Sequence, residues 1–547
     1  MSDPIIIQGE EQSQVDTALA DGGLPLAVGV HSFQVFRASK ATKPDNGKGW
    51  TYHHHVDMAC WKGRLYVGWN SCERDEDVWP SRELYASSSD GKNWTEPAEM
   101  FPQGISTCLR MYFYLARNGR MLIIAGLRRD TTDTDENTKG GLVVRELRAD
   151  HTLGPVFKLR KPETFEESKD AGFVDACRQL LVDTVFLEQQ DRGRLLGKRR
   201  MKWHEESNWP GGKVPGHNEK WVAGKAYSFF TRPDGLLVGV CKMGWVATSS
   251  DDGKTWSQPT VPATLVTGKA KVWTQQTRDG RFALVYNPSA RQRFPLIVVT
   301  GDDGITFSEM RIVQGELPRQ RYPGMHRSVG PQYVRGISNW SDDGSRGDEQ
   351  AMWLVYSINK EDIWVSRVPL PVKADADGKS AEWNVYSPKW APVTVAGNVV
   401  TLEDRDPYDY ARATRVFPKG RGEATISFEV TAQEMGEGSE RLEIDLLGSP
   451  ASARPVRLRV ANPRRGKPLS YVIKADASKG RYTVTRDGVV VTPNATFVAP
   501  CEALDRISFR TGGFRNLGGT QPVDPETDRP HDPLVFTVSD LRVDSGG

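Results

Sequence analysis

A short motif that recurs along the chain constrains the fold more than any other feature of the sequence. Residues 249–256 read Ser-Ser-Asp-Asp-Gly-Lys-Thr-Trp, and residues 300–307 repeat the pattern with Thr for Ser and Phe for Trp. Residues 87–94 form a degenerate third copy, with Ser89 in the place of the first Asp. Asp and Gly build a tight turn, because glycine adopts positive φ without strain and the Asp side chain accepts hydrogen bonds from nearby N–H groups. The recurrence predicts a repeated β-hairpin unit.

A second repeat, a glycine turn followed by an apolar run, has a compatible spacing. It occurs at Gly63, Gly119, Gly235 and Gly280, and the interval between Gly119 and Gly235 is about twice the others. One unmarked unit is therefore expected at about 165–222, and a further unit covers 352–367. Repeats of roughly 40–55 residues with several short strands are typical of β-propellers. The sequence predicts an all-β fold with a six-bladed propeller over 30–372, or seven blades if 128–222 holds two.

The pattern of apolar and polar residues changes after the predicted propeller. Residues 373–387 are expected to be a linker, and residues 1–29 an N-terminal segment. From 388 to 547, short runs alternate between apolar and polar residues and are separated by turn residues. This alternation predicts an antiparallel β-sandwich of the jelly-roll or concanavalin-like kind. Carbohydrate binding and a purely structural role as a cap are both open for it.

Composition excludes several classes of function. The formal net charge is only +2, so neither nucleic acid nor a membrane is expected as a partner. No apolar run approaches the ~20 residues of a membrane span. The six cysteines lack CxxC spacing, which argues against a zinc site or a disulfide framework. No signal peptide is recognisable, so the chain as it stands is expected to be cytoplasmic, or periplasmic or secreted if a leader has been removed. The oligomeric state stays open.

Two strand-like segments carry candidate catalytic residues. In 52–55, alternation places His53 and His55 on one face of a strand, where two imidazoles near neutral pKa suit proton transfer. In 110–114, alternation places Arg110, Tyr112 and Tyr114 on one face. An arginine beside two phenols suits a carboxylate, and tyrosine can act as acid or base. Ordinary strand packing is the alternative in both cases.

Three polar segments carry candidate substrate-binding residues, because binding groups often lie on loops of a rigid scaffold. The loop 315–327 contributes Arg321, Tyr322 and His326. Lys360 lies in the turn 359–362, which also reads as a tight turn closing the ring. A weaker loop candidate contains His217.

The repeated motif is the Asp-box, and with the blade repeats it makes residues 30–372 resemble the sialidase-like propellers with BNR repeats. Sialidases carry Arg-Ile-Pro before the first blade, whereas Arg37 is followed here by Ala38 and Ser39. The His-rich stretch 52–55, followed by Lys-Gly-Arg-Leu-Tyr at 62–66, is more similar to propeller enzymes that act on rhamnose–glucuronate linkages and on ulvan.

That resemblance implies a carbohydrate-active enzyme that cleaves an acidic glycan by β-elimination next to a uronic acid. Arg110 then neutralises the carboxylate, His53 or His55 takes the C5 proton, and Tyr112 or Tyr114 protonates the leaving oxygen. No cofactor and no metal are required, and a structural calcium ion in the channel stays open. One alternative is a glycoside hydrolase with a carboxylate pair drawn from candidates such as Asp57, Glu316 and Glu361. The other is a non-catalytic glycan-binding propeller.

Overall fold

The protein was analysed as a computed structural model. It describes residues 4–8, 15–40, 50–76, 78, 81–102, 107–127, 142–160, 163–183, 185–186, 226–257, 259–337, 350–373, 376, 382–436, 442–513 and 521–545. The chain forms two compact units. Unit 1 comprises Met1–Ser13, Val35–Met310 and Tyr322–Val365, and unit 2 comprises Gln14–Gln34, Arg311–Arg321 and Ser366–Gly547.

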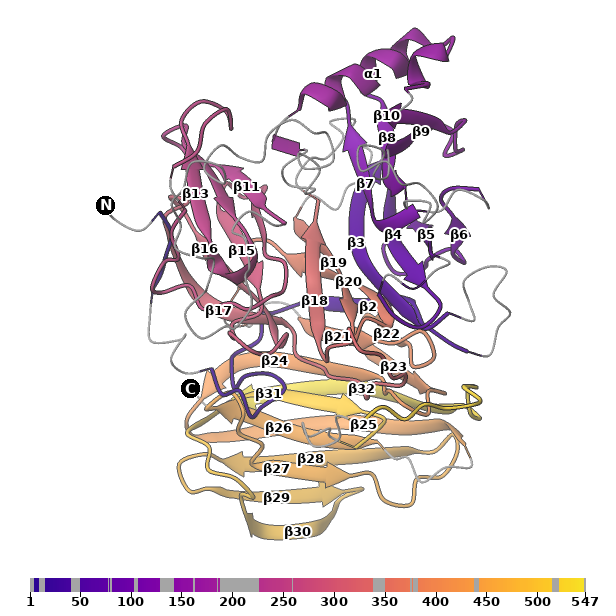
Figure 1. Ribbon diagram of the computed structural model, residues 1–547. Coiled ribbons are helices and arrows are strands. Elements are labelled where there is room, and N and C mark those ends of the chain that lie inside the picture. The colour runs from indigo at the N-terminus through magenta and orange to yellow at the C-terminus, as the bar shows by residue number, and fades with distance from the viewer. Residues whose placement is uncertain are drawn as a thin grey trace. The chain divides into compact units, whose positions relative to one another are not determined.

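Unit 1 is built from small sheets of consecutive strands (Figure 1). The first contains β3 (Tyr52–Trp61), β4 (Arg64–Cys72), β5 (Ser81–Ser88) and β6 (Ala98–Glu99). The second contains β7 (Thr107–Leu115), β8 (Met121–Leu127), β9 (Leu142–Leu147) and β10 (Phe157–Arg160). The third contains β11 (Ser228–Thr231), β12 (Leu237–Val240) and β13 (Val246–Ser249). The fourth contains β14 (Trp273–Gln276), β15 (Phe282–Tyr286), β16 (Leu296–Gly301) and β17 (Thr306–Gln314), with β1 (Ile6–Ile7) parallel to β17.

A further run of strands follows the order β18 (Pro331–Gly336), β19 (Ala351–Ile358), β20 (Asp362–Pro369) and β2 (His31–Phe36). The first strands of the sheets lie beside one another: β3 contacts β7 and β18, and β14 contacts β11 and β18. This is the arrangement of a propeller, in which the first strand of each blade lines the centre. An all-β, propeller-like architecture with four separate blades is therefore present. The predicted count of six or seven blades is not confirmed and stays a prediction.

The turns at the three motif copies show why the motif recurs. In the copy at 249–256, Asp251 Oδ1 accepts the N–H of Thr255 at 2.8 Å, and the indole of Trp256 donates to the carbonyl of Gly253 at 3.1 Å. The glycines at the turns, Gly91, Gly253 and Gly304, all have positive φ. Gly91 also has Trp353 so close that an added Cβ would lie 2.1 Å from its ring. Glycine is needed there both for its backbone conformation and for the space.

The described part of the unmarked unit expected at 165–222 is helical, and residues 187–222 lie outside the described residues. Residues 171–182 form helix α1 (Ala171–Val182), preceded by the 3₁₀ turn Phe165–Glu167. Asp170 caps the helix by accepting the N–H groups of Gly172 and Phe173. The residues that α1 buries, Phe173, Val174, Ala176, Cys177 and Leu180, follow the three-to-four-residue spacing of a helix. From sequence, the run 180–186 is compatible with either strand or helix, because a short apolar run does not distinguish the two.

Unit 2 is a sandwich of two sheets, whose strands are antiparallel except for the parallel pair β2 and β21. One face continues from β2 through β21 (Trp383–Ser387), β24 (Arg412–Gly420), β31 (Ala503–Arg510), β26 (Glu443–Ser449) and β27 (Val456–Arg459). The facing sheet has the order β22 (Val393–Ala396), β23 (Val399–Asp404), β32 (Leu534–Ser545), β25 (Glu423–Met435), β28 (Pro468–Asp476), β29 (Arg481–Arg486) and β30 (Val489–Thr496). Between the two sheets, the ring centres of Phe428 and Phe509 lie 5.2 Å apart. Strand β21 begins inside the stretch 373–387 that was expected to be a linker.

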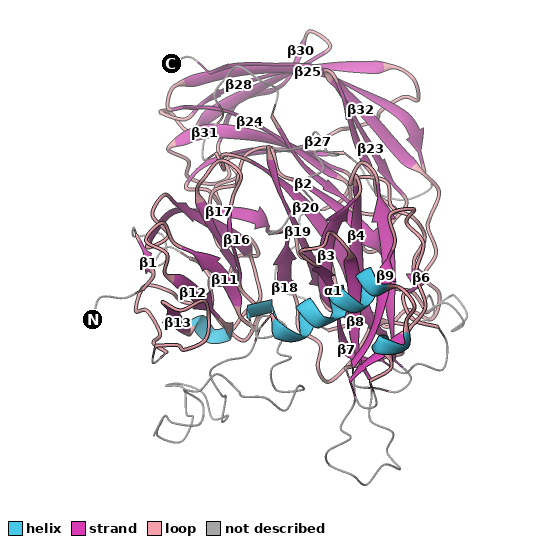
Figure 2. Ribbon diagram, turned by 90° about the horizontal axis from the view of Figure 1, so that it is seen from above, coloured by secondary structure: helices cyan, strands magenta, loops and turns pink. Residues whose placement is uncertain are grey.

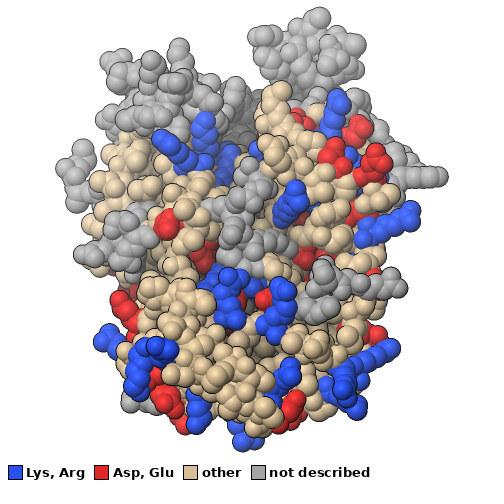
Figure 3. All heavy atoms as spheres, turned by 90° about the horizontal axis from the view of Figure 1, so that it is seen from below, with Lys and Arg blue, Asp and Glu red and all other residues tan. Residues whose placement is uncertain are grey.

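Strands dominate the described residues, with α1 as the main helix (Figure 2). None of the described helices is long and apolar enough to cross a membrane. Lysine and arginine side chains are interspersed with aspartate and glutamate on the face in Figure 3, in keeping with the formal charge of +2. Among the described residues, this face therefore carries no broad patch of a single charge.

Candidate functional site

Buried charged and aromatic side chains gather in unit 1 where β3 and β18 begin. We call this group the Tyr333 cluster. It comprises Tyr333, Lys242, Lys271, Arg293, Lys360, Glu76, His54 and His55. Tyr333 is 6% exposed, and three of its cationic neighbours (Lys242, Lys271 and Lys360) are buried as well. Burial of so many charged groups is costly unless they interact, which marks the cluster as a candidate functional site.

The phenol of Tyr333 is surrounded by cations. Lys242 Nζ donates a hydrogen bond of 2.5 Å to Tyr333 Oη and lies 4.3 Å from the centre of its ring. Lys271 Nζ and the guanidinium carbon of Arg293 lie 5.3 and 5.4 Å from the same ring centre. An ammonium in hydrogen-bond contact with a phenol stabilises the phenolate.

The balance of charges makes Tyr333 unusually acidic. Burial by itself raises the pKa of Tyr333, but Lys242, then Arg293 and Lys360, outweigh burial and lower that pKa to about 8. By contrast Tyr52, also buried in this unit, has a pKa raised well above the usual value, chiefly by burial and then by Glu76. Tyr333 therefore differs from a structurally buried tyrosine in carrying an oxygen that ionises near physiological pH.

Two histidines contact the ring of Tyr333. The centre of the His54 ring lies 4.1 Å from that of Tyr333, and the centre of the His55 ring lies 5.2 Å away. His54 Nδ1 is 2.7 Å from Ser357 Oγ, and its buried Nε2 has no hydrogen-bond partner among the described residues. Burial and then Lys360 hold the pKa of His54 well below its usual value, so its imidazole is neutral.

Glu76 connects the second histidine to a lysine. His55 Nε2 lies 3.2 Å from Glu76 Oε1, and Lys360 Nζ donates to Glu76 Oε2 at 3.0 Å. Burial raises the pKa of Glu76, but hydrogen bonding and attraction from His55, then Lys360, hold it well below its usual range. The carboxylate of Glu76 is therefore ionised.

Unusual backbone geometry positions these side chains. His55, Tyr333, Asn359 and Lys360 have φ of 54°, 59°, 58° and 56°, in a region that side chains other than glycine seldom adopt. The pairing of β3 with β4 shifts register between His54 and Asp57, and a similar shift in β18 encloses Tyr333. Such bulges turn a side chain to a direction that regular alternation does not give, and they are frequent beside active sites.

The bulge in β3 changes the expected grouping of histidines. Strict alternation predicted His53 and His55 on one face, but the structure brings His54 and His55 together at Tyr333. His53 is fully buried elsewhere: its ring lies 4.4 Å from that of Phe36, and its Nε2 is 2.9 Å from the carbonyl oxygen of Trp50. The alternation rule failed here because the extra residue of the bulge shifts the side chains that follow.

The aromatic residues of β7 are buried. Tyr112 is 1% exposed. Tyr114 belongs to the apolar core that includes α1, and its hydroxyl donates to Asp183 at 3.3 Å. Burial and then Asp183 raise the pKa of Tyr114 above its usual value, so its phenol is not predisposed to ionise. Arg110 lies in β7, but its side chain is outside the described residues.

The residues predicted on loops lie in different parts of the structure. Tyr322 is fully buried, and its N–H donates to Glu361 at 2.7 Å. His326 is half-exposed, with Nδ1 3.6 Å from Asp75. Arg321 belongs to unit 2, where it lies 3.7 Å from Asp528. Of the site residues predicted from sequence, the structure brings His55 and Lys360 to the Tyr333 cluster. His217 lies outside the described residues.

The carboxylates named as hydrolase candidates do not form one pair. Asp57 is buried and accepts the N–H of Phe113 at 2.9 Å; burial raises its pKa to about 6 against the opposing effect of Arg335. Glu361 binds the N–H of Tyr322, and Glu316 belongs to unit 2, where it pairs with Arg412. Within the described ranges, no group of three or more His, Cys, Asp or Glu side chains is placed to hold a metal ion.

Sequence reasoning missed Tyr333, Lys242, Lys271 and Arg293. Tyr333 lies inside β18 and Lys242 follows β12 after one intervening residue, and neither position carries a local signal. Nothing local indicated that residues 91 positions apart would share a hydrogen bond.

Comparisons with known proteins agree with this architecture. A family model described as a BT_1020-like N-terminal β-propeller matches residues 3–193, and one described as a sialidase-like CBM domain matches residues 383–462. No curated protein matches the chain. A solved structure named a sialidase is 29% identical with a TM-score of 0.82, over 100% of this chain and 54% of its own. This chain therefore spans about half the length of that protein.

Two further solved structures are less similar. The Trypanosoma rangeli sialidase in complex with sialic acid is 11% identical, with a TM-score of 0.36, over 95% of this chain and 96% of its own. A fructofuranosidase from Schwanniomyces occidentalis is 10% identical, with a TM-score of 0.30, over 96% of this chain and 99% of its own. The resemblance to sialidase-like propellers that the sequence predicted is confirmed by the two family models and the sialidase of higher similarity.

Proposed function

We propose that this chain is an enzyme that cleaves a glycosidic bond in a glycan containing an acidic sugar, with Tyr333 as the reactive group. The observation that carries the proposal is the 2.5 Å hydrogen bond from Lys242 to Tyr333 inside a buried group of cations. A phenol with a pKa of about 8 supplies a usable fraction of phenolate near neutral pH. The name of the more similar solved structure, a sialidase, supports a glycan-directed activity.

The charge of the cluster favours an acidic substrate. Lys242, Lys271 and Arg293 surround one phenol, and a carboxylate on the sugar interacts favourably with such a group of cations. The surroundings are buried, so these attractions are screened less than on the surface. A neutral sugar gains none of this stabilisation.

In the hydrolytic route, the phenolate oxygen of Tyr333 attacks the anomeric carbon while the glycosidic C–O bond breaks. The leaving oxygen takes a proton from His55, whose ring contacts that of Tyr333 and whose Nε2 lies 3.2 Å from Glu76. Water then attacks the anomeric carbon, its proton returns to His55, and the phenolate is released. Tyrosine is an established nucleophile for glycosidases that depart from the two-carboxylate pattern, and the absence of a paired set among Asp57, Glu316 and Glu361 favours this route.

The second candidate is β-elimination at a uronic acid. It is favoured by the contact between the neutral His54 ring and Tyr333, which places two groups able to transfer protons side by side. In this route the phenolate takes the C5 proton, and the cations stabilise the carboxylate of the carbanion-like intermediate. The bond between C4 and the glycosidic oxygen then breaks, and the phenol of Tyr333 gives its proton to that oxygen, which leaves as an alcohol. The product then carries a C4–C5 double bond.

The test is incubation of the full chain with a panel of sialylated and uronic-acid glycans, with reducing ends and absorbance at 235 nm measured together. Hydrolysis releases reducing ends without absorbance at 235 nm, whereas elimination produces both. Tyr333→Phe should abolish the signal that the wild type gives. If wild type binds these glycans but releases neither product, the chain is a glycan-binding propeller and the proposal is wrong.

A further inference from the structure

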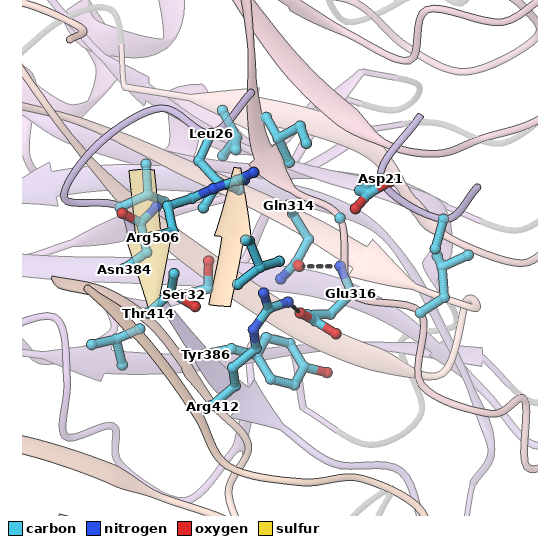
Figure 4. A pocket seen from close by; sticks show the side chains of 18 of the residues that line it. Asp21, Leu26, Ser32, Gln314, Glu316, Asn384, Tyr386, Arg412, Thr414 and Arg506 are labelled. Atoms are coloured by element: carbon cyan, nitrogen blue, oxygen red, sulfur yellow. Dashed lines mark hydrogen bonds and ion pairs between the residues drawn. The ribbon is translucent and has the colours of Figure 1, made fainter. Parts of the chain in front are cut away.

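A pocket in unit 2 is lined by three arginines, and we call it the arginine pocket. Arg412 comes from β24, Arg506 from β31, and Arg454 from the segment before β27. Segments 20–32 and 312–317 complete the wall, and every lining residue belongs to unit 2. Figure 4 shows the side chains of Arg412 and Arg506 extending into the same space. The pocket is separate from the Tyr333 cluster and uses none of its residues.

Two of the arginines are held in place by their own partners. Arg412 Nε donates to Ser508 Oγ at 2.9 Å, and its Nη1 pairs with Glu316. Arg506 Nε donates to Asp505 at 2.7 Å, and its Nη2 donates to the carbonyl of Ala451 at 2.7 Å. No hydrogen bond between described residues uses Arg412 Nη2 or Arg506 Nη1. Both guanidinium groups are therefore fixed in orientation and still have N–H groups to offer a ligand.

The surroundings of the third arginine disfavour its own charge. Burial and then Arg412 lower the pKa of Arg454 to about 10, and the carboxylates of Asp445 and Asp21 only partly oppose this. Arg454 is thus still protonated at neutral pH, although burial and Arg412 disfavour its charged form. An anion in the pocket offsets both the burial and the repulsion between the arginines.

The size of the pocket limits what it can hold. Its cavity volume is about 70 Å³. At about 10–15 Å³ for each water, that space holds on the order of five waters, which matches a single oxyanion group and not a whole sugar ring. Ser32, Asn384 and Thr414 place neutral polar groups on the wall (Figure 4). These polar groups can form hydrogen bonds with those oxygens of the oxyanion that the arginines do not reach.

We propose that the arginine pocket binds an oxyanion, which is either a free inorganic ion or the carboxylate or sulfate substituent of a glycan. Arg412, Arg454 and Arg506 provide the positive charge and the N–H donors. Planar guanidinium groups suit this role because they form paired hydrogen bonds with carboxylate, sulfate and phosphate. The proposal does not depend on catalysis at Tyr333.

The direct test is isothermal titration calorimetry of the full chain with sulfate, inorganic phosphate, glucuronate and glucose at constant ionic strength. Saturable binding of at least one anion at a single site, with no binding of glucose, is expected. Tighter binding of sulfate or phosphate identifies a free ion as the ligand, and tighter binding of glucuronate identifies a glycan substituent. If no anion shows saturable binding, the proposal is wrong.

Two variants with opposite expected effects on anion affinity test where the anion binds. Arg454→Gln should weaken binding about tenfold or more, because it removes one unit of positive charge from the wall. Asp21→Asn should tighten binding, since it removes a lining carboxylate while Asn can still accept the N–H of Gly23, which lies 3.0 Å from Asp21 Oδ1. Arg459→Gln, an exposed arginine of β27 outside the pocket, is the matched control and should bind like wild type.

The Asp21→Asn result keeps the test decisive if Arg454→Gln fails to fold. Should neither Arg454→Gln nor Asp21→Asn differ from wild type in affinity, the anion binds elsewhere and the assignment to this pocket is overturned. Tyr333→Phe is expected to bind the anion as wild type does. Its loss of glycan cleavage then reports on the proposed function alone, so the two proposals can fail separately.

Discussion

The Tyr333 cluster and the arginine pocket both gather buried cations, but they use them differently. In unit 1, lysines and Arg293 surround a phenol that ionises near pH 8. In unit 2, Arg412 is paired with the carboxylate of Glu316. This carboxylate also accepts a hydrogen bond of 2.5 Å from the hydroxyl of Tyr410. The first arrangement holds a group able to gain and lose a proton at physiological pH, and the second holds permanent charges.

The difference follows from the residue types. Lysine beside a buried phenol lowers the pKa of the phenol, so the pair exchanges between charged and neutral forms within the range of catalysis. Arginine keeps its charge, and its planar donors favour fixed geometry over proton transfer. A buried cluster of cations therefore indicates a catalytic role where it contains a group that titrates near neutral pH. It indicates a binding role where it contains no such group. Three changes test this distinction.

The largest effect is expected from Tyr333→Phe. Loss of the phenol oxygen should lower kcat/KM on a cleaved glycan by about 10³-fold or more, because a nucleophile or base in contact with the reacting atoms is lost. The measurement is initial rate against substrate concentration, with the thermal midpoint recorded alongside. The matched control is Tyr66→Phe, which removes the hydroxyl of a buried tyrosine that bonds His151, and its activity should stay close to that of wild type. Equal losses in the two variants would contradict a chemical role for Tyr333.

An intermediate effect, on stability and not on activity, is expected from Glu316→Gln. Arg412 then keeps its charge in a largely buried position without its carboxylate, which should cost about 2 kcal/mol in the free energy of unfolding of unit 2. Urea unfolding followed by tryptophan fluorescence measures it. Glu443→Gln breaks the more exposed pair with Arg459 and should change stability by less than about 1 kcal/mol. Loss of glycan cleavage without loss of stability in Glu316→Gln would break the comparison.

The smallest effect is a displacement of a pH profile. Lys242→Gln removes the ammonium that does most to lower the pKa of Tyr333, so that pKa should rise from about 8 toward the usual value of a phenol. In wild type, kcat/KM should increase with pH as Tyr333 ionises, and in the variant the same rise should occur at higher pH. At pH 7 the expected loss is about tenfold for each unit of displacement. An unchanged profile would show that the ionisation of Tyr333 does not limit the reaction.

Parts of the site were accessible from sequence. His55 and Lys360 were predicted, His55 from the His-rich start of the first blade and Lys360 from the turn of the last. Both lie in the Tyr333 cluster with Glu76. His53 was grouped with His55 by alternation, and the bulge in β3 defeats that rule. Tyr333 and Lys242 gave no local signal, because a tyrosine in a strand and a lysine after one are unremarkable until the fold brings them together.

The fold class was determined by the sequence alone. Positive φ at Gly91, Gly253 and Gly304 is a local requirement of the motif, and alternation in 388–547 is a local property of half-buried strands, so both can be read from neighbouring residues. Helix α1 and the arrangement of the Tyr333 cluster were decided by the tertiary structure. Contacts between residues that lie far apart in sequence depend on how the sheets pack and on where each strand bulges, and a pKa depends on the sum of charges that such packing assembles.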